Sequence, residues 1–364
     1  MVDLRATLEK LSNEFGPSGH EKAVRALIKT EIEGLVDRVE VDALGNLIAF
    51  KAGTGPEPRL KLMVSAHMDE IGFMVLQIEK SGLVRFGRVG GLDGRMLLSK
   101  RVVIGDEKVP GIIGLKPHHL TSDDEDERVP DLNDLAIDLG AEDDKVAGGK
   151  VKVGDYGTFA TRFTVLSEDP AWPTVRGKAF DDRAGCTALI GLLAALRQTQ
   201  DSERYPVDLY AVFTVQEEVG LRGARVAAYR VAPDAAIALE GTVCDDTPKA
   251  PDEDVSPVTR LGAGPAVTLM DRSLVSHPGM VRLLQDAAAA EGIAIQYKQP
   301  ALGGTDSGAI HLTRAGVPAV TVAVPCRYIH SPASILNLND LTNTVKLVAA
   351  ALQRVKREDI VCGA

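Results

Sequence analysis

The sequence has few cysteines, no excess of positive charge and no long apolar segment. The four cysteines, Cys186, Cys244, Cys326 and Cys362, are scattered and form no CxxC pair, which argues against a structural zinc knuckle and a disulfide framework. We interpret them as buried, inert thiols. With 51 acidic against 41 basic side chains the net charge is -10, so the chain lacks the basic surface that nucleic acids and anionic membranes require.

The N-terminal segment, residues 1–35, is charged and shows helical spacing instead of the apolar core of a signal peptide. No stretch elsewhere is apolar and long enough to span a bilayer. We therefore expect a cytoplasmic protein without a membrane partner. At 364 residues the chain exceeds the usual limit for one compact core, so two structural domains are expected.

Apolar periodicity predicts an α/β protein interrupted by a β-rich insert. Helical spacing over residues 4–35 is broken at Gly16-Pro17-Ser18-Gly19, and a strand pair is expected at 39–51 and a buried strand at 60–66. From residue 71 to about 164, short runs of valine and isoleucine alternate with glycine turns, which is typical of a small β domain.

After Lys178 the pattern of helices alternating with strands returns. This alternation predicts a layered, mixed and mostly parallel sheet flanked by helices. The expected helices cover residues 183–198, 221–229, 277–290, 305–315 and 338–355, and the expected strands cover 207–215, 235–239, 266–270, 293–299 and 319–324.

Two sets of charged residues are interpreted as surface features. The run from Ser122 to Arg128 is highly charged, and we read it as a solvated loop without chemistry. Arg183, Arg272 and Lys298 would favour acidic substrates if they lined a pocket, but we interpret them as surface charges.

Polar side chains follow several of the expected strands. Because ligands gather beyond the carboxyl ends of strands in open α/β sheets, we expect these side chains to meet. They are His67 and Asp69 after strand 60–66, Glu217 and Glu218 after 207–215, Glu240 after 235–239 and His330 beyond 319–324, together with Asp181 and Asp182 at a helix start.

Histidine and carboxylate side chains in this number suit two divalent ions joined by a bridging carboxylate. Such ions activate water, polarise a scissile carbonyl and can anchor a substrate amine, which favours an aminopeptidase. Consecutive Glu217 and Glu218 point apart, so one can bind metal while the other accepts the proton of the water. Asp69 lies on the same side of an extended strand as His67 and can orient its ring. Taken singly, each residue also fits a structural role.

Seven segments, in this order, resemble the M42 family of metallo-aminopeptidases, which includes glutamyl aminopeptidases and the tetrahedral TET particles. The resemblance spans nearly the whole chain. The segments are residues 16–21 (GPSGHE), 65–73 (SAHMDEIGF), 111–118 (GIIGLKPH), 179–185 (AFDDRAG), 216–220 (QEEVG), 303–306 (GGTD) and 327–331 (RYIHS).

The resemblance implies a role for each site residue. Glu217 would be the general base and Asp69 would support His67. Two divalent ions, zinc or cobalt, would be the cofactors, and Asp182 is the alternative to Asp181 as their bridge. The implied ligands are His67 and Glu240 for one ion, Glu218 and His330 for the other, and Asp181 between them.

The loop of Gly303, Gly304, Thr305 and Asp306 resembles the family's substrate-pocket loop, so it would lie beside the substrate. A turn in which Thr305 or Asp306 caps a helix explains the same residues.

The resemblance also implies a domain plan and a reaction. Residues 1–70 and 165–364 would form a catalytic domain of the zinc-aminopeptidase fold. Residues 71–164 would form a PDZ-like domain through which subunits dimerise and assemble, commonly into dodecamers. The reaction would be hydrolysis of the first peptide bond of short peptides with a free N-terminus. Two alternatives stay open: a two-metal hydrolase that removes an N-acyl group or a C-terminal residue, and a non-catalytic assembly subunit.

Overall fold

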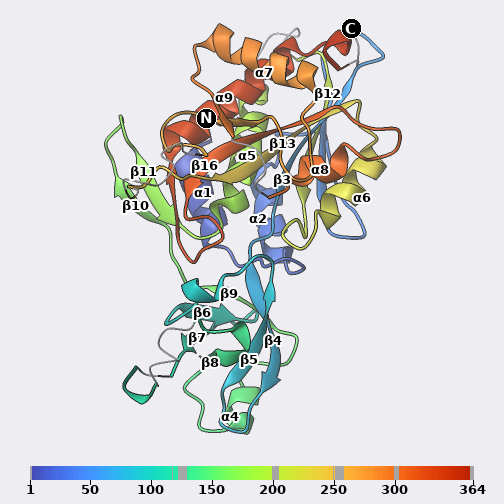
Figure 1. Ribbon diagram of the computed structural model, residues 1–364. Coiled ribbons are helices and arrows are strands. Elements are labelled where there is room, and N and C mark those ends of the chain that lie inside the picture. The colour runs from blue at the N-terminus through green and yellow to red at the C-terminus, as the bar shows by residue number, and fades with distance from the viewer. Residues whose placement is uncertain are drawn as a thin grey trace.

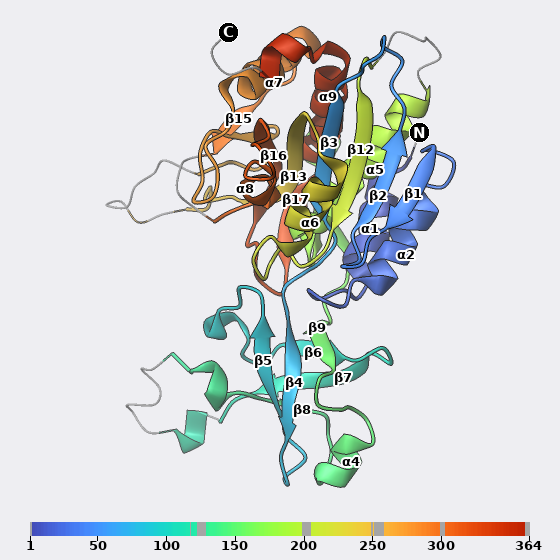
Figure 2. The same cartoon turned by 90° about the vertical axis from the view of Figure 1, so that its right-hand side faces the viewer.

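A computed structural model describes residues 2–116, 118–121, 129–198, 205–248, 250, 258–298 and 303–360. Figures 1 and 2 show a large region of sheet and helices and, below it, a smaller β-rich region. The charged run from Ser122 to Arg128 and Cys362 lie outside the described residues. Within these ranges, every helix is too short or too polar to cross a membrane.

The large region is built on a sheet of 11 strands within the described chain. Its centre is parallel: β12 (Asp208–Thr214), β3 (Lys61–His67), β13 (Ala235–Val243) and β16 (Ala319–Arg327). The strands outside this centre are β1 (Arg38–Val41), β2 (Leu47–Lys51), β17 (Ser334–Asn337), β11 (Thr174–Gly177), β10 (Thr164–Ser167), β14 (Ala266–Thr268) and β15 (Gln296–Lys298). Most outer pairings are antiparallel, so the sheet is mixed and the expected parallel character is limited to its centre.

Helices cover both faces of the sheet because successive side chains of its central strands point to opposite faces. Leu62 and Val64 of β3 pack into the larger core, with α1 (Leu4–Asn13), α2 (Lys22–Glu31), α5 (Phe180–Gln198), α7 (Pro278–Glu291) and α9 (Leu338–Arg354). Met63 packs into a second core with α6 (Arg222–Val231) and α8 (Asp306–Ile310). Cys186, Cys244 and Cys326 are buried free thiols, as expected.

Among the elements whose boundaries differ from those expected, three lie beside the predicted site residues. Strand β13 continues past Leu239 because its ladder with β16 extends to Val243 opposite Cys326, so Glu240 lies within the strand instead of after it. Strand β15 is only three residues long, at Gln296–Lys298. Helix α8 ends at Ile310, and its short length agrees with the weak helix propensity of Ser307 and Gly308.

The β-rich insert is a closed barrel in the order β4, β5, β8, β7, β6, β9. Its core includes Phe73 and Phe86, whose rings meet edge to face at 5.3 Å. The PDZ-like description stays a prediction. The barrel strands are β4 (Gly72–Ile78), β5 (Val84–Val89), β6 (Arg101–Ile104), β7 (Val109–Gly114), β8 (Ala136–Asp138) and β9 (Tyr156–Phe159), accompanied by α4 (Asp144–Gly148). Short 3-10 helices are η1 (Gly94–Met96), η2 (His118–Leu120), η3 (Leu132–Asp134) and, in the large region, η4 (Arg357–Ile360).

A buried ion network joins the barrel to the sheet. Glu70 precedes β4 and is 2% exposed. Its carboxylate accepts hydrogen bonds from Lys178 Nζ at 2.7 and 2.8 Å and from the barrel residue Thr158 at 2.9 Å. Arg183, fully buried, lies 3.4 Å away. Burial lowers the pKa of Lys178 to about 8 despite the adjacent Glu70. Arg183 is therefore a core cation, and its interpretation as a surface charge was wrong.

Replacing Glu70 with alanine is expected to lower the free energy of unfolding by about 3–5 kcal/mol, because Lys178 and Arg183 would stay buried without their counter-charge. Denaturant unfolding followed by circular dichroism measures this change. The matched control is Glu40→Ala, which removes the exposed pair with Arg230 and should have little effect because water screens such pairs. Equal losses in the two variants would contradict a structural role for the Glu70 network.

Candidate metal centre

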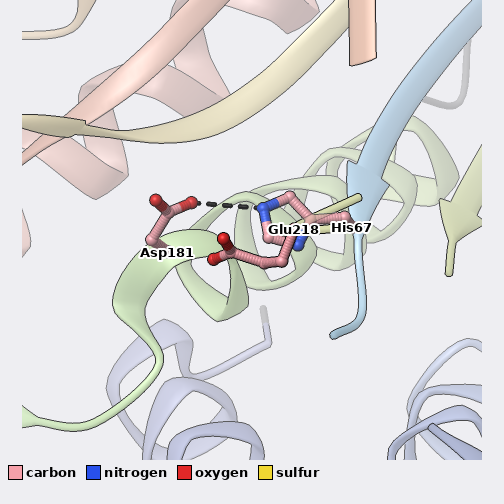
Figure 3. A group of neighbouring side chains, drawn as sticks. All are labelled: His67, Asp181 and Glu218. Atoms are coloured by element: carbon pink, nitrogen blue, oxygen red, sulfur yellow. Dashed lines mark hydrogen bonds and ion pairs between the residues drawn. The ribbon is translucent and has the colours of Figure 1, made fainter. Parts of the chain in front are cut away.

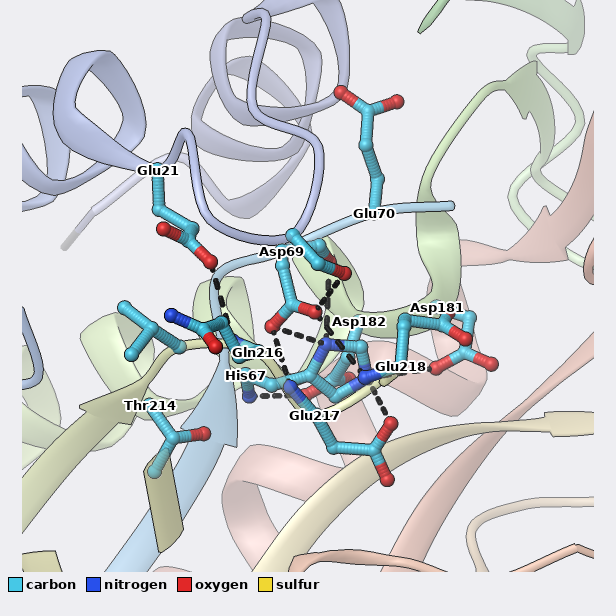
Figure 4. A network of polar contacts seen from close by, with 12 residues as sticks. Glu21, His67, Asp69, Glu70, Asp181, Asp182, Thr214, Gln216, Glu217 and Glu218 are labelled. Carbon is cyan, nitrogen blue, oxygen red and sulfur yellow. Dashed lines mark hydrogen bonds and ion pairs between the residues drawn. The ribbon is translucent and has the colours of Figure 1, made fainter. Parts of the chain in front are cut away.

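A cluster of histidine and carboxylate side chains lies at the carboxyl edge of the four parallel strands. His67 is the last residue of β3, Glu217 and Glu218 follow β12, and Glu240 lies in the second half of β13. Asp181 comes from the start of α5, and His330 follows β16. The structure thus brings together all six residues expected from the sequence to bind metal or act as base. Figures 3 and 4 show His67, Asp181, Glu217 and Glu218 of this set.

His67 is at the buried centre of this cluster, with 1% of its side chain exposed. Its Nδ1 contacts the backbone carbonyl of Asp69 at 3.1 Å, so Nδ1 carries the proton and Nε2 faces the carboxylates. Nε2 lies 3.2 Å from Asp181, 3.5 Å from Glu240 and 3.9 Å from Glu217.

His330 lies on the other side of Asp181 and is more open, with 39% of its side chain exposed. Its Nε2 lies 3.3 Å from the second oxygen of Asp181 and 3.5 Å from Glu218. Its Nδ1 lies 3.3 Å from the carbonyl of Gly91, a residue of the barrel region. A Cβ at position 91 would lie 2.8 Å from that Nδ1, so the approach requires glycine. Asp181 therefore stands between the two imidazoles, one oxygen toward each.

Asp69 holds several parts of the site in register. Its carboxylate accepts hydrogen bonds from the backbone N–H groups of Glu217 at 3.0 Å and Glu218 at 3.2 Å, and from the Ser18 hydroxyl at 2.6 Å. It also lies 3.5 Å from His67 Nδ1. The preceding turn is constrained, because Gln216 has φ 57° and its N–H donates to Glu21. Figure 4 shows how these contacts fix the two glutamates.

Asp182 lies next to the cluster but is held by the backbone. Its oxygens accept from the N–H groups of His67 at 3.0 Å and Gly185 at 2.8 Å. Two groups have ligand atoms within 4.8 Å of one another: His67, Asp181 and Glu218, and His67, Asp182 and Glu240. Asp181 alone contacts both imidazoles in the ion pairs of the described residues.

The cluster carries an excess of buried negative charge. Burial, reinforced by neighbouring carboxylates, raises the pKa of Glu240 and Glu217 well above the usual range and the pKa of Glu218 to about 7. Burial alone would lower the pKa of both imidazoles, but hydrogen bonds to Asp181 outweigh it, so the pKa of His330 rises to about 9 and that of His67 also rises. Divalent cations relieve such an excess, and imidazole nitrogen with carboxylate oxygen suits zinc, cobalt or manganese.

A cavity of about 560 Å³ opens over the cluster. Asp181, Glu217, Glu218, Glu240 and His330 line it, and so do Gly303, Gly304 and Thr305 of the expected substrate loop and Lys298 of β15. Asp306 lies behind the wall, where its backbone N–H donates to Glu240 at 3.2 Å and its carboxylate accepts from Thr214. The side chain of Thr305, the residue that precedes α8, makes no capping hydrogen bond with the helix.

Sequence reasoning missed or misread several residues of the site. Ser18 belongs to the segment 16–21 of the family resemblance, but no role was assigned to it, and Gly91 was not singled out. Both residues act through contacts with residues far away in the chain, which sequence patterns do not reveal. Arg272 is exposed, as predicted. Lys298 is not a surface charge: it is only 9% exposed and lines the cavity.

Comparison with known proteins places this cluster in a family. Residues 45–347 match the profile described as M42 glutamyl aminopeptidase. The chain is similar to a lysyl aminopeptidase of Pyrococcus furiosus (34% identity over 99% of each chain) and to a glutamyl aminopeptidase of Lactococcus lactis subsp. cremoris (33% identity over 99% of this chain and 98% of the relative).

Solved structures agree with the sequence matches. The fold is similar to that of a TET aminopeptidase from a marine sediment archaeon, Thaumarchaeota archaeon SCGC AB-539-E09, with a TM-score of 0.91, 35% identity and 99% coverage of both chains. It is also similar to the TET1 peptidase of Pyrococcus horikoshii, which can assemble into a tetrahedron or a large octahedral shell, with a TM-score of 0.82, 34% identity and coverage of 97% of this chain and 100% of the other. With its profile match, its relatives and its fold in agreement, the chain belongs to the M42 family of aminopeptidases and is a hydrolase.

Proposed function

We propose that the protein removes the N-terminal residue of short peptides that have a free N-terminus, using two divalent cations. The observation that carries the proposal is the position of Asp181, which lines the cavity and whose two oxygens face the Nε2 atoms of His67 and His330. A carboxylate so placed suits the bridge of a binuclear site.

The proposed ligands divide around this bridge. His67 and Glu240, 3.5 Å apart, would hold one cation, and His330 and Glu218, also 3.5 Å apart, would hold the other. Asp182 would serve as a backbone-held neighbour of the bridge. Zinc or cobalt fits the nitrogen and oxygen donors. When bound, the cations would lower the pKa of a water molecule and polarise the scissile carbonyl.

Glu217 is proposed as the general base. Its carboxylate is buried and lies 3.9 Å from His67 Nε2, and among the described residues no lysine or arginine donates a hydrogen bond to it. Burial and the neighbouring glutamates raise its pKa, which suits a group that takes a proton from water and returns it to the leaving amine. Asp69 would act as a positioning residue, because it fixes the backbone of Glu217 and the ring of His67.

The loop of Gly303, Gly304, Thr305 and Asp306 is proposed to border the substrate. The first three residues line the cavity, while Asp306 supports Glu240 from behind. The relatives described as lysyl and glutamyl aminopeptidases favour an aminopeptidase over a deacylase, a carboxypeptidase or a non-catalytic subunit.

The barrel, whose PDZ-like character stays a prediction, is proposed to mediate dimerisation in a dodecamer located in the cytoplasm. The assembly of Pyrococcus horikoshii TET1 into a tetrahedron or a large octahedral shell supports the self-assembly part of this proposal.

The activity is tested with free and N-acetylated short peptides incubated with metal-loaded and chelator-treated protein. Only free peptides should be cleaved, from the N-terminus, and chelation should abolish cleavage until zinc or cobalt is restored. Mass spectrometry of the products identifies the bond that is broken. Cleavage of acetylated peptides alone would favour the deacylase, release of C-terminal residues would favour a carboxypeptidase, and inertness with every metal would favour the non-catalytic subunit.

Glu217→Gln is expected to reduce kcat by about 100-fold to 10,000-fold, because the amide cannot accept the proton of the water, while two cations per chain stay bound. Isothermal titration calorimetry counts the cations. Asp181→Asn should instead weaken the binding of both cations, and Glu168→Gln, at an exposed glutamate, should change neither property. Loss of cation binding in Glu217→Gln would contradict its role as base.

Self-assembly is tested by light scattering coupled to size-exclusion chromatography. The chain has a mass of 38.7 kDa, and the expected species is a particle of about 12 such masses, as a tetrahedral assembly of symmetric dimers requires. A species with the mass of one chain at assay concentration would contradict the proposal.

A further inference from the structure

We infer that Lys298 binds a carboxylate of the substrate inside the cavity, and so selects peptides with negative charge next to the scissile bond. The inference rests on the proposed function. Two groups of a short peptide supply this chemistry: an acidic side chain on its first residue, or the terminal carboxylate of a dipeptide.

Lys298 is held within the fold near the metal centre. It ends β15 and pairs with Thr268 of β14, which pairs in turn with Thr321 of β16. One strand further, Ala238 of β13 pairs with Thr321, two residues before Glu240. Its side chain lines the same cavity as Glu240 and the loop residues Gly303 to Thr305, so it borders the space that a substrate would occupy.

The ammonium group of Lys298 makes no hydrogen bond or ion pair with the residues that the structure describes, although the side chain is only 9% exposed. Lys178, the other buried lysine of the described chain, shows the ordinary arrangement: its Nζ meets both oxygens of Glu70 and the carbonyl of Glu14. Buried charges are normally paired because removing them from water is costly. Most of the Lys298 side chain is buried, whereas its ammonium group, without a partner among the described residues, remains accessible from the cavity and can pair with an anionic ligand there.

None of the carboxylates that line the cavity pairs with Lys298, so the substrate would supply its anionic partner. Its acidic lining residues, Asp181, Glu217, Glu218 and Glu240, contact the two imidazoles, and none forms an ion pair with Lys298. Relatives of similar identity are named for lysyl and for glutamyl residues, so membership of the family does not by itself determine the preferred residue. In this chain, Lys298 determines the preference for a negatively charged substrate.

The test compares matched substrates that differ only in the carboxylate. Glu-Ala-amide against Gln-Ala-amide isolates the side chain, and Leu-Ala against Leu-Ala-amide isolates the terminus. The wild type should prefer the charged member of one pair. In Lys298→Met the ratio of kcat/KM within that pair should fall by about 30-fold or more, as expected when one partner of a buried charge pair is removed. Lys298→Arg should retain much of the ratio.

The control variant is Lys61→Met, which removes an exposed lysine at the opposite end of β3, and its ratios should match the wild type. A loss confined to the Glu/Gln pair assigns the acidic side chain as the ligand, and a loss confined to the acid/amide pair assigns the terminal carboxylate. An active wild type that prefers neither charged member, or ratios unchanged in Lys298→Met, would overturn the inference.

Binding without turnover separates this inference from the proposed function. Calorimetric titration of metal-loaded protein should show tighter binding of L-glutamate than of L-glutamine if the acidic side chain is the ligand. For the terminal carboxylate, Leu-Ala and Leu-Ala-amide are titrated separately into the Glu217→Gln variant, and Leu-Ala should bind more tightly. Either preference should disappear in Lys298→Met. A protein that hydrolyses no peptide but binds the charged ligand more tightly would contradict the aminopeptidase proposal and leave the carboxylate site standing. A protein that hydrolyses peptides but prefers neither charged ligand would contradict the carboxylate site and leave the aminopeptidase proposal standing.

Discussion

The concentration of buried carboxylates at the carboxyl edge of the sheet is the constraint on which the rest of the structure depends. Asp69, Asp181, Asp182, Glu217, Glu218, Glu240 and Asp306 share this volume with two imidazoles. Such a cluster opposes folding unless its charge is neutralised by protons or cations. Four strands buried on both faces hold their carboxyl ends, and the site residues there, in place against this repulsion. The stability of the sheet centre is therefore what makes the site possible.

Asp69 shows how one buried side chain can organise several segments. Ser18 comes from the first loop, His67 from the end of β3, and Glu217 and Glu218 from the turn after β12. Because both oxygens of Asp69 are occupied, the backbone of the two adjacent glutamates has little freedom. One of them turns toward His67 and the other toward His330, so the division of labour proposed for this pair follows from how the turn is anchored.

Much of this arrangement could be predicted from the sequence because it depends on short-range patterns. A buried strand followed by a polar residue locates His67 and Glu217, and helical spacing locates α5 and α9. The sequence pattern predicts Glu240 after a strand because a charged residue follows the apolar run 235–239, yet the ladder with β16 continues through it. Arg183 and Lys298 were misread for a similar reason, since the burial of a cation depends on segments distant in the chain. Barrel closure likewise depends on the long-range pairing of β6 with β9.

The contact between Gly91 and His330 links two parts of the molecule that sequence separates by 239 positions. The carbonyl of Gly91 belongs to the barrel region, whereas the ring it meets faces Asp181 and Glu218. The orientation of a histidine depends on the partner of its second nitrogen. The orientation of the His330 ring therefore depends on the position of the barrel. Tilting the barrel relative to the sheet would rotate the imidazole, so the insert helps to align the site.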